Sequence, residues 1–474
     1  MATRWSPPQI SSKANQDREA KAYPYKHFTN YYSLFHMSRI LTKQLSQFID
    51  QEVEVQGWLH KVRRLGSLMF IILRDRSGLV QILVEDQAEQ TKFDGIYQGS
   101  ILKIIGLVKS DTRAHFGVEI HSPHIEVIVP VTYVSPVEID KPLGHSEREL
   151  ETLFEYRPIT LRNSFEADIF KIQDEIQVLV REYFKSQDFT EFHSPKLLAE
   201  ASEGGAEVFK LDYFKGKKAT LAQSAQFYKQ IMVGAYERVF EIGATYRAEP
   251  SVTSRHMSEF MTIDAEMGFI GGLNDIQDCL GDLLIYTVDK LWESQSVRLD
   301  NLKALKPKLT AKIPEIPLKD LHELYFQKTG HDLRKEPDPS PIEERWICEY
   351  YAEVWGSEAI FVTEFPSAHA KFYHYISEEK PEVAERADLI FRGVEIATLS
   401  RREHRYEKLV EQLRQIGASP DSDGFKHYMS AFKFGMPSHG GFGLGLERLT
   451  QKILGLSNVK EAALFPRDTS RLAP

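Results

Sequence analysis

Cysteine is scarce in this sequence of 474 residues, which has only Cys279 and Cys348. Two isolated cysteines provide neither the ligand spacing of a zinc site nor a disulfide framework, and this scarcity favours a reducing, cytoplasmic setting. Long hydrophobic runs are also missing: no stretch approaches the ~18 apolar residues of a membrane span, and the N-terminal residues lack the apolar core of a secretory signal. The sequence therefore predicts a cytoplasmic protein with no membrane partner.

An excess of positive charge is absent as well, because 59 basic residues face 68 acidic ones and the formal net charge is −9. This balance argues weakly against a nucleic-acid partner, but a net charge conceals local patches. One basic patch lies between His60 and Arg76, where Asp75 is the single acid beside Lys61, Arg63, Arg64, Arg74 and Arg76.

The length suggests about two to four domains of ~150 residues each. Residues 1–35 mix proline, serine, lysine and glutamine and are expected to be a flexible extension. Residues 36–133 begin with a short amphipathic helix and continue with closely spaced strands separated by turns, which predicts a five-stranded β-barrel of OB type. A barrel with a basic first hairpin and a surface aromatic is typical of single-strand nucleic-acid readers, although a barrel used only for packing remains an alternative.

Residues 134–165 contain Pro136, Pro142 and Pro158 and are expected to form a hinge. The remaining stretch, 166–474, opens with a long amphipathic helix from about residue 164 and an extended segment carrying Pro195. Between 271 and 360 helical stretches alternate with prolines, and no motif is recognisable there.

The stretch from Val239 to Phe269 alternates with a period of two on both arms of an expected β-hairpin. One face of this hairpin carries polar groups and an aromatic ring. It consists of Glu241, Gly243, Thr245, Arg247 and Glu249 on the first arm and Phe260, Thr262, Asp264 and Glu266 on the second. The connecting loop adds Arg255 and His256. Charges of both signs beside an aromatic favour a polar pocket over a solvated sheet surface.

Two further segments lie near the end of the sequence. Residues 387–405 are expected to form one strand that ends in a polar turn. Glycines at 440, 441, 443 and 445 then leave a strand nearly bare on one face, which fits either tight packing or the approach of a ligand. Arg448 follows in the first turn of a helix, where backbone N–H groups also attract anions.

These pieces occur in the order of motifs 1, 2 and 3 of the class II aminoacyl-tRNA synthetases, which the chain resembles from about residue 38 to 474. The segments QSAQFYKQ, SRREHR and LFPRDTSRLAP are most similar to the aspartyl-tRNA synthetases of archaeal and eukaryotic type. The resemblance implies an α+β fold in which an OB-type anticodon-binding barrel precedes an antiparallel sheet flanked by helices. It also implies a homodimer with the 166–198 helix and strand at the interface.

The resemblance implies an ATP site. Arg247 and Arg448 would be the catalytic arginines that hold the phosphates, because a carboxylate must approach a polyanion. Glu249 would bind the adenine amino group and Phe260 would stack on the ring, while Glu395 and Thr398 would hold Mg²⁺. The other implied ATP-binding residues are Arg255, His256, Met257, Gly445 and Glu447.

An aspartate site and an anticodon site follow from the same resemblance. Lys229 and Arg402 would face the side-chain carboxylate of aspartate, although without the motif a solvated helix residue would be favoured for Lys229. Gln226, Glu203 and Asp264 would engage the α-amino group, and Arg247 and Thr398 complete the implied aspartate site. In the barrel, Phe70 and Gln81 would stack on and read anticodon bases of tRNA.

The sequence departs from the aspartyl pattern mildly at Asp188 and Ala225 and more strongly in two other places. Leu399 and Ser400 replace two glycines and are followed by Arg401, which predicts a narrowed or reshaped substrate pocket. Pro250 and Val252 alter the motif 2 loop that faces the tRNA. The sequence therefore favours an aspartate–tRNA ligase, and two alternatives stay open: an asparaginyl enzyme or a paralogue with an acceptor other than tRNA, and a non-catalytic RNA-binding paralogue.

Overall fold

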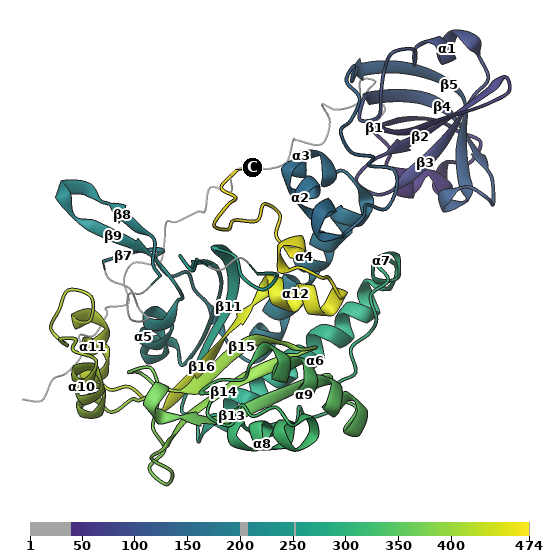
Figure 1. Ribbon diagram of the computed structural model, residues 1–474. Coiled ribbons are helices and arrows are strands. Elements are labelled where there is room, and N and C mark those ends of the chain that lie inside the picture. The colour runs from purple at the N-terminus through teal and green to yellow at the C-terminus, as the bar shows by residue number, and fades with distance from the viewer. Residues whose placement is uncertain (1–38, 200–206, 251–252, 474) are drawn as a thin grey trace, which may run out of the picture. The chain divides into compact units, whose positions relative to one another are not determined.

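The computed structural model describes residues 39–199, 207–250 and 253–473, which form two compact units, one ending at Ser135 and the other beginning at Pro136 (Figure 1). No helix within these ranges is long and apolar enough to cross a membrane. The expected N-terminal extension lies outside the described residues.

The first unit is the predicted five-stranded barrel, closed in the order β1-β2-β3-β5-β4. Its strands are β1 (Glu52–Leu65), β2 (Leu68–Arg74), β3 (Leu79–Val84), β4 (Ile101–Ser110) and β5 (Val118–Val129), with α1 (Gln87–Thr91) and the 3₁₀ helices η1 (Thr42–Phe48) and η2 (His115–Gly117). Alternate residues of β2 and β3 point into an apolar interior, so Met69, Ile71 and Ile82 are fully buried. The closely spaced strands separated by turns therefore predicted the barrel correctly.

The second unit is built on an eight-stranded sheet in the order β12-β13-β14-β15-β16-β11-β10-β6. Neighbours are antiparallel except for the two outermost pairs, which are parallel. The strands are β6 (Thr190–Glu191), β10 (Arg238–Tyr246), β11 (Glu259–Gly268), β12 (Glu315–Pro317), β13 (Ala359–Pro366), β14 (Val383–Phe391), β15 (Val394–Arg401) and β16 (His439–Gly445). A three-stranded sheet adds β7 (Leu197–Leu198), β8 (Lys210–Asp212) and β9 (Lys218–Leu221).

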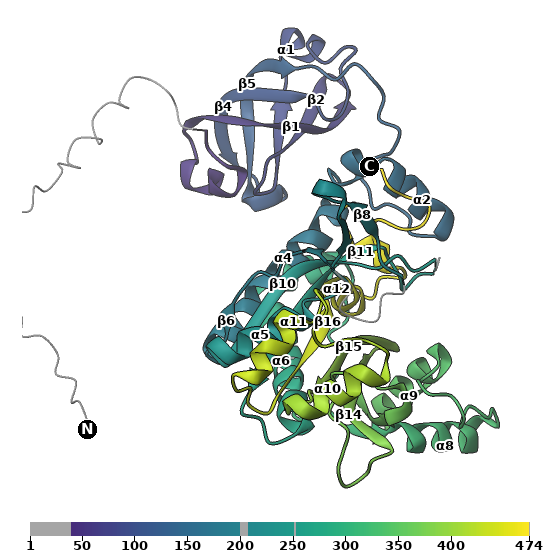
Figure 2. The ribbon, with the colours of Figure 1, turned by 90° about the vertical axis from the view of Figure 1, so that its left-hand side faces the viewer.

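One face of the large sheet is apolar and packs against α4 (Ser164–Ser186) and α6 (Leu273–Ser294). Phe184 of α4 stacks on Phe240 of β10 with ring centroids 4.6 Å apart. Two further helices, α8 (Leu318–Thr329) and α9 (Pro341–Val354), lie together against the β13 end of the sheet (Figure 2). The opposite face of the sheet is left for the polar groups.

The remaining helices are shorter. They are α2 (Glu147–Glu155), α3 (Arg157–Thr160), α5 (Gln226–Tyr236), α7 (Ser296–Asn301), α10 (Tyr406–Gln415), α11 (Lys426–Lys433), α12 (Leu446–Leu454), η3 (Phe214–Gly216), η4 (Ser367–His369) and η5 (Val459–Ala462).

The segment expected as a hinge contains α2 and α3 and is packed against the end of the chain. Arg157 is only 1% exposed and donates hydrogen bonds to the carbonyl oxygens of Ala463 and Leu464 and to Glu166. Pro158 lies in the first turn of α3, where its missing N–H group leaves no partner unsatisfied, so the proline marks a helix start here.

Candidate active site

The register of the central strands brings the predicted polar groups to one face. On β10 and β11, Glu241 lies opposite Asp264, and Thr245 opposite Phe260. On the other side of β11, Gly443 of β16 lies opposite Asp264, and Gly441 opposite Glu266. A Cβ atom on Gly441 would collide with the Glu266 carboxylate, so glycine is required where these acids cross the sheet.

A cavity of about 360 Å³ opens on this face. Every catalytic, ATP-binding, aspartate-binding and metal-binding residue predicted in the described part of the chain lines it: Gln226, Lys229, Arg247, Glu249, Arg255, His256, Met257, Phe260, Asp264, Glu395, Thr398, Arg402, Gly445, Glu447 and Arg448. Glu203 and Val252 lie outside the described residues. These predicted residues come from four separate parts of the sequence, which sequence order alone does not bring together.

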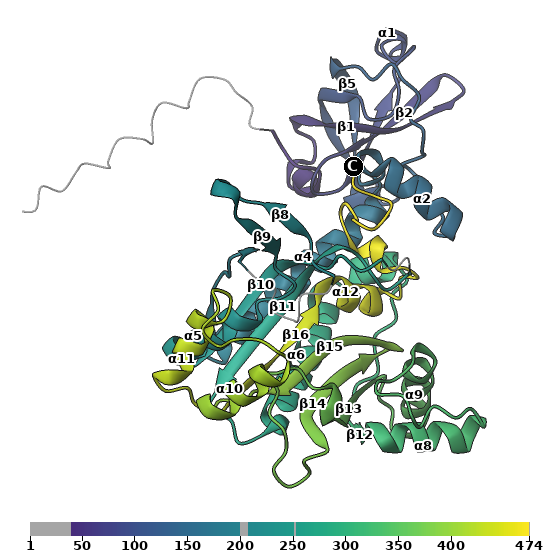
Figure 3. The same ribbon diagram turned by 60° about the vertical axis from the view of Figure 1, so that its left-hand side comes forward.

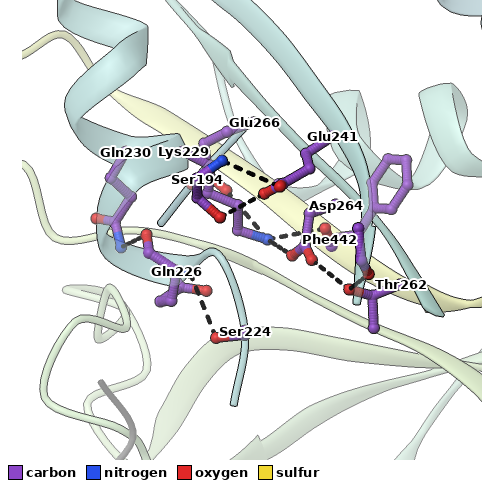
Figure 4. Close-up of polar contacts among 12 residues, drawn as sticks. Ser194, Ser224, Gln226, Lys229, Gln230, Glu241, Thr262, Asp264, Glu266 and Phe442 are labelled. Atoms are coloured by element: carbon purple, nitrogen blue, oxygen red, sulfur yellow. Dashed lines mark hydrogen bonds and ion pairs between the residues drawn. The ribbon is translucent and has the colours of Figure 1, made fainter. Parts of the chain in front are cut away.

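Two buried cations mark the inner part of the cavity. Lys229 of α5 is 1% exposed and donates to Asp264 Oδ1 and to the carbonyl oxygen of Phe442, each at 2.8 Å (Figure 4). The alternative of a solvated helix residue is therefore wrong. Arg402 donates from Nε to Glu266 Oε1 at 2.8 Å and from Nη2 to Glu266 Oε2 at 3.2 Å.

These contacts keep the inner cavity polar and charged. Burial disfavours the charged form of Arg402, but the Glu266 carboxylate outweighs that effect and raises the pKa of the guanidinium. The carboxylate of Asp264 also accepts a hydrogen bond from Thr262 at 2.8 Å. Gln226 is 4% exposed, and its amide nitrogen finds no hydrogen-bond partner among the described residues, which leaves a polar group available to a ligand.

Arg247 lies in the outer part of the cavity at the end of β10. Its guanidinium is 5.5 Å from the centre of the Phe260 ring, and its Nη1 is 3.6 Å from Glu249 Oε1. The side chain is 41% exposed, so it remains accessible to an anionic ligand. His256 lies nearby, and burial together with Arg448 lowers the pKa of its imidazole.

A third group of polar side chains comes from β15 and α12. Thr398 donates to Glu395 Oε1 at 2.9 Å, and Arg448 donates to the carbonyl oxygen of Glu395 at 2.8 Å. Asp388 of β14 lies opposite Thr398, and its Oδ1 is buried without a partner among the described residues. Burial raises the pKa of Asp388 to about 7. Burial also acts to raise the pKa of Glu395, but Arg448, the Thr398 hydroxyl and further arginines together outweigh it and lower that pKa.

This arrangement fits a hard cation that is shared with a ligand. Two carboxylates and a hydroxyl are the oxygen donors that Mg²⁺ prefers. Among the residues described, no group of three or more His, Cys, Asp and Glu side chains is arranged to hold a metal alone. Phosphate oxygens of a nucleotide would therefore have to supply the remaining ligands.

Known proteins with similar sequences share this organisation. Residues 149–469 match the family described as tRNA synthetases class II (D, K and N), and residues 53–128 match the OB-fold nucleic acid binding domain. The chain belongs to the class II aminoacyl-tRNA synthetases. It is 39% identical over 436 residues to the aspartate–tRNA(Asp/Asn) ligase of Thermus thermophilus, covering 92% of this chain and all of the relative. It is 38% identical over 444 residues to the aspartate–tRNA(Asp) ligase of Pyrococcus abyssi, covering 93% and 99% of the two chains.

Solved structures of this family agree in fold. The asparaginyl-tRNA synthetase of Pyrococcus horikoshii with asparaginyl-adenylate superposes with a TM-score of 0.84 at 28% identity, covering 93% of this chain and 100% of that chain. The aspartyl-tRNA synthetase of Entamoeba histolytica gives a TM-score of 0.79 at 26% identity, covering 100% and 99%. The predicted fold class and family are thus confirmed.

One expectation about the synthetase sheet is wrong. Residues 387–405 do not form a single strand, because β14 and β15 make a hairpin joined by Arg392 and Gly393, which have φ of 47° and 78°. Glycine adopts such angles easily, and Arg392 is held by Glu358 at 3.1 Å. Recognising this turn would have placed Asp388 opposite Thr398 in the site, and the sequence reasoning missed it.

The expectation that two added side chains narrow the pocket is also corrected. Leu399 is fully buried on the apolar face, opposite Ala387 and Phe442, and points away from the cavity. Ser400 alone lies on the polar face, where its hydroxyl accepts a hydrogen bond from Arg402. Alternation along a strand separates the two neighbours.

Glu344 of α9 contacts residues of the cavity and was not predicted. It accepts the Glu395 N–H at 3.1 Å and pairs with Arg255, and burial raises the pKa of its carboxyl. It comes from the stretch in which no motif was found. The lining residues of the cavity that were not predicted are Gln223, Ser224, His369, Lys371, Tyr373, His374, Arg386, Ile396 and Val459.

In the barrel, the two residues predicted to read the anticodon point outward. Phe70 and Gln81 are half-buried, whereas their strand neighbours Met69 and Val80 are buried. Phe70 lies opposite Arg63 of β1, and Gln81 donates to Glu119 at 2.9 Å. Phe70 is therefore not a core residue, and the outer face carries both the aromatic ring and basic residues.

Proposed function

We propose that the protein is an aspartate–tRNA ligase, which activates L-aspartate with ATP and transfers the aspartyl group to tRNA. The observation that carries this proposal is the pair of buried cations, Lys229 and Arg402, at the inner part of a cavity whose outer part presents Arg247 and Arg448. The relatives from Thermus and Pyrococcus, which match nearly the whole chain, carry aspartate–tRNA ligase names.

Activation requires a carboxylate oxygen of aspartate to attack the α-phosphorus of ATP. The new carboxylate–phosphorus bond forms as the bond from the α-phosphorus to the bridging oxygen breaks, and pyrophosphate leaves. Arg247 would hold the α-phosphate and the attacking carboxylate, and Arg448 the outermost phosphate, so that positioning and charge carry the reaction. Glu249 and Phe260 would orient the adenine, with Arg255, His256, Met257, Gly445 and Glu447 completing the nucleotide site.

The transfer step uses the same geometry. A hydroxyl of the terminal ribose of tRNA attacks the carbonyl carbon of the adenylate, and AMP leaves with the electron pair of the broken bond while its phosphate takes up the proton of the hydroxyl. The second step needs the end of the tRNA inside the cavity.

Glu395 and Thr398 would hold Mg²⁺, joined by Asp388, and the ion when bound neutralises phosphate charge.

Selection of aspartate would rest on unused N–H groups. Lys229 has three donors, of which two are engaged at 2.8 Å. Glu266 Oε2 lies 3.6 Å from Nζ, beyond hydrogen-bonding distance, so the third donor would bind a side-chain carboxylate. Arg402 retains one N–H on Nη1 after its bonds to Glu266, Gly441 and Ser400. Gln226 and Asp264 would bind the α-amino group, with Glu203, Arg247 and Thr398 completing the aspartate site.

We further propose that Phe70 and Gln81 bind the anticodon of the tRNA, and that the enzyme is a cytoplasmic homodimer. Support for the dimer comes from apolar groups exposed on α4 and just after Pro195: Val178 is 41% and Leu197 is 53% exposed. A dimer formed through this segment would remove these apolar side chains from water.

ATP–pyrophosphate exchange tests the chemistry. Aspartate is expected to drive exchange, and Arg247→Ala should reduce it by at least about 10² because it removes a group that stabilises transition-state charge. Arg334→Ala is the matched control, since Arg334 is exposed on the surface and pairs with Asp332. Undiminished exchange in Arg247→Ala would contradict the proposed role.

Parallel aminoacylation of purified tRNA with aspartate and asparagine tests the substrate. Exchange with asparagine but not aspartate would identify the enzyme as asparaginyl. Exchange with aspartate but no transfer to any tRNA would favour a paralogue with another acceptor, and no exchange with either would favour a non-catalytic paralogue.

A further inference from the structure

The hairpin formed by β8, η3 and β9 projects from the second unit (Figure 3). Every residue from 209 to 218 is exposed. Strand pairing within the hairpin is short, because only Lys210, Leu211 and Asp212 pair with β9. The proposed activity assigns no role to it.

Lysines and aromatic rings share this hairpin. Between residues 208 and 221 there are four lysines, Lys210, Lys215, Lys217 and Lys218, and Asp212 is the single acid. The side chains at 209, 211 and 213 project to one side, since Leu211 lies opposite Ala219, and the pairs Lys210–Thr220 and Asp212–Lys218 face the other. Tyr213 is 46% and Phe214 is 78% exposed, and their rings meet edge to face at 5.1 Å.

The base of the hairpin is continuous with the cavity. Immediately after β9 the chain reaches Gln223 and Ser224, both of which line the cavity. The Tyr246 N–H donates to the carbonyl oxygen of Ala222 at 2.9 Å, and the Ala248 N–H donates to that of Glu207 at 2.8 Å. Both ends of the hairpin are thus tied to the chain on either side of Arg247.

We infer that the β8–β9 hairpin binds the single-stranded 3′ end of the tRNA as it enters the cavity. Single-stranded nucleic acids are held by cations that follow the backbone and by aromatic rings on which bases stack. The hairpin supplies both, and the transfer step brings a 3′ end to the adjacent cavity. This inference rests on the proposed function for the identity of the RNA.

Charge argues against a second copy of the chain as the occupant. A two-fold contact through the hairpin would bring the same lysines together from both copies, and like charges repel. A polyanion would instead neutralise the net charge of +3 that four lysines and one aspartate give.

Two double variants of the full-length enzyme test the inference. Lys215→Glu with Lys217→Glu reverses the charge, and Tyr213→Ser with Phe214→Ser removes the rings. Because these side chains are exposed, the variants should fold, and exchange with aspartate should stay within twofold of the unmodified enzyme. Each is expected to lower kcat/KM for tRNA about tenfold or more. Lys319→Glu with Lys335→Glu, exposed lysines of α8 and the following loop, is the matched control and should charge tRNA normally.

Binding to tRNA with and without its single-stranded 3′ nucleotides identifies the segment recognised. Removing these nucleotides should weaken binding by the unmodified enzyme and have little further effect on the Tyr213→Ser, Phe214→Ser variant. Normal charging by both variants, or an equal effect of nucleotide removal on variant and parent, would overturn the inference. If the variants dissociate from an oligomer that the unmodified enzyme forms, the inference is also overturned, because the hairpin would then bind a second copy of the chain. If the unmodified enzyme shows no ATP–pyrophosphate exchange, the proposed function is refuted. The tRNA-binding measurements would still test whether the hairpin binds the 3′ end.

Discussion

At the scale of single residues, the inner cavity is organised by charges that compensate one another. Lys229 and Arg402 are both less than 5% exposed and are paired with Asp264 and Glu266. Removing one partner of a buried pair leaves an uncompensated charge, which is strongly destabilising. Substitutions of these four residues would therefore combine effects on folding and on binding, so a neighbouring neutral residue gives a cleaner test.

Ser400 is that neighbour, because its hydroxyl accepts an N–H of Arg402. Ser400→Ala should leave the guanidinium less fixed and raise the KM for aspartate in exchange about fivefold, the equivalent of one hydrogen bond of about 1 kcal/mol. The turnover number should change less than about twofold, since the phosphate-binding arginines are untouched.

Steady-state exchange kinetics over a range of aspartate concentrations separate the two constants. Ser400→Thr, which keeps a hydroxyl, is the matched variant and should recover part of the loss. An unchanged KM in Ser400→Ala would mean that Ser400 only fills space.

At the scale of elements, the two faces of β15 have different roles. Thr398 and Ser400 line or adjoin the cavity, while Leu399 between them is fully buried against the helices of the apolar face. Stability and substrate binding are thus carried by adjacent residues of one strand.

Leu399→Ala should lower the free energy of unfolding by about 2–5 kcal/mol, because it opens a cavity in a packed interior. Urea unfolding measures the loss, and the KM for aspartate below the unfolding transition should stay near that of the parent. A large change in KM with unchanged stability would contradict the assignment of Leu399 to the core. Ser400→Ala should show the opposite pattern in the same two measurements.

The sequence predicted those elements whose local pattern decides their structure. The hairpin of β10 and β11 alternates over its whole length, so its polar face could be listed before the register was known. Asp388 and Glu344 were missed for different reasons. Asp388 lies in a strand whose turn at Gly393 was not recognised, whereas Glu344 lies in a helix that reaches the site only through tertiary packing. Local periodicity contains no information about which distant helix packs beside a strand.

At the scale of the whole molecule, the charged cluster of His145, Glu166 and Glu461 joins three distant parts of the chain. His145 Nε2 lies 2.9 Å from Glu166 Oε1, and its Nδ1 contacts Glu461 at 2.5 Å. Hydrogen bonds to Glu166 and Glu461 raise the pKa of His145 from 6.5 to about 10. The cluster therefore fastens the segment before α2 to α4 and η5.

Stability should depend on pH through this cluster. Since the folded pKa lies above the unfolded value of 6.5, charged His145 stabilises the folded chain fully below pH 6.5 and progressively less as the pH rises towards 10. His145→Gln should lower the free energy of unfolding by about 1–3 kcal/mol at pH 6 and by much less near pH 10.

Thermal unfolding at the two pH values measures the difference. His331→Gln, at an exposed position, is the matched control and should show no such pH dependence. An equal loss at both pH values would mean that His145 acts by packing and not by its charge.

The strand order of the large sheet has a consequence for synthesis of the protein. The strand β16 (His439–Gly445) lies between β15 and β11 in the sheet but follows β11 (Glu259–Gly268) far along the chain, so a central position of the sheet stays empty while the residues between them are synthesised. Until it arrives, β11 and β15 each present an unpaired edge, and such edges recruit other strands and favour aggregation. Nascent chains that have completed β15 but not β16 should therefore depend on chaperones, and chains released before residue 439 should accumulate as aggregates.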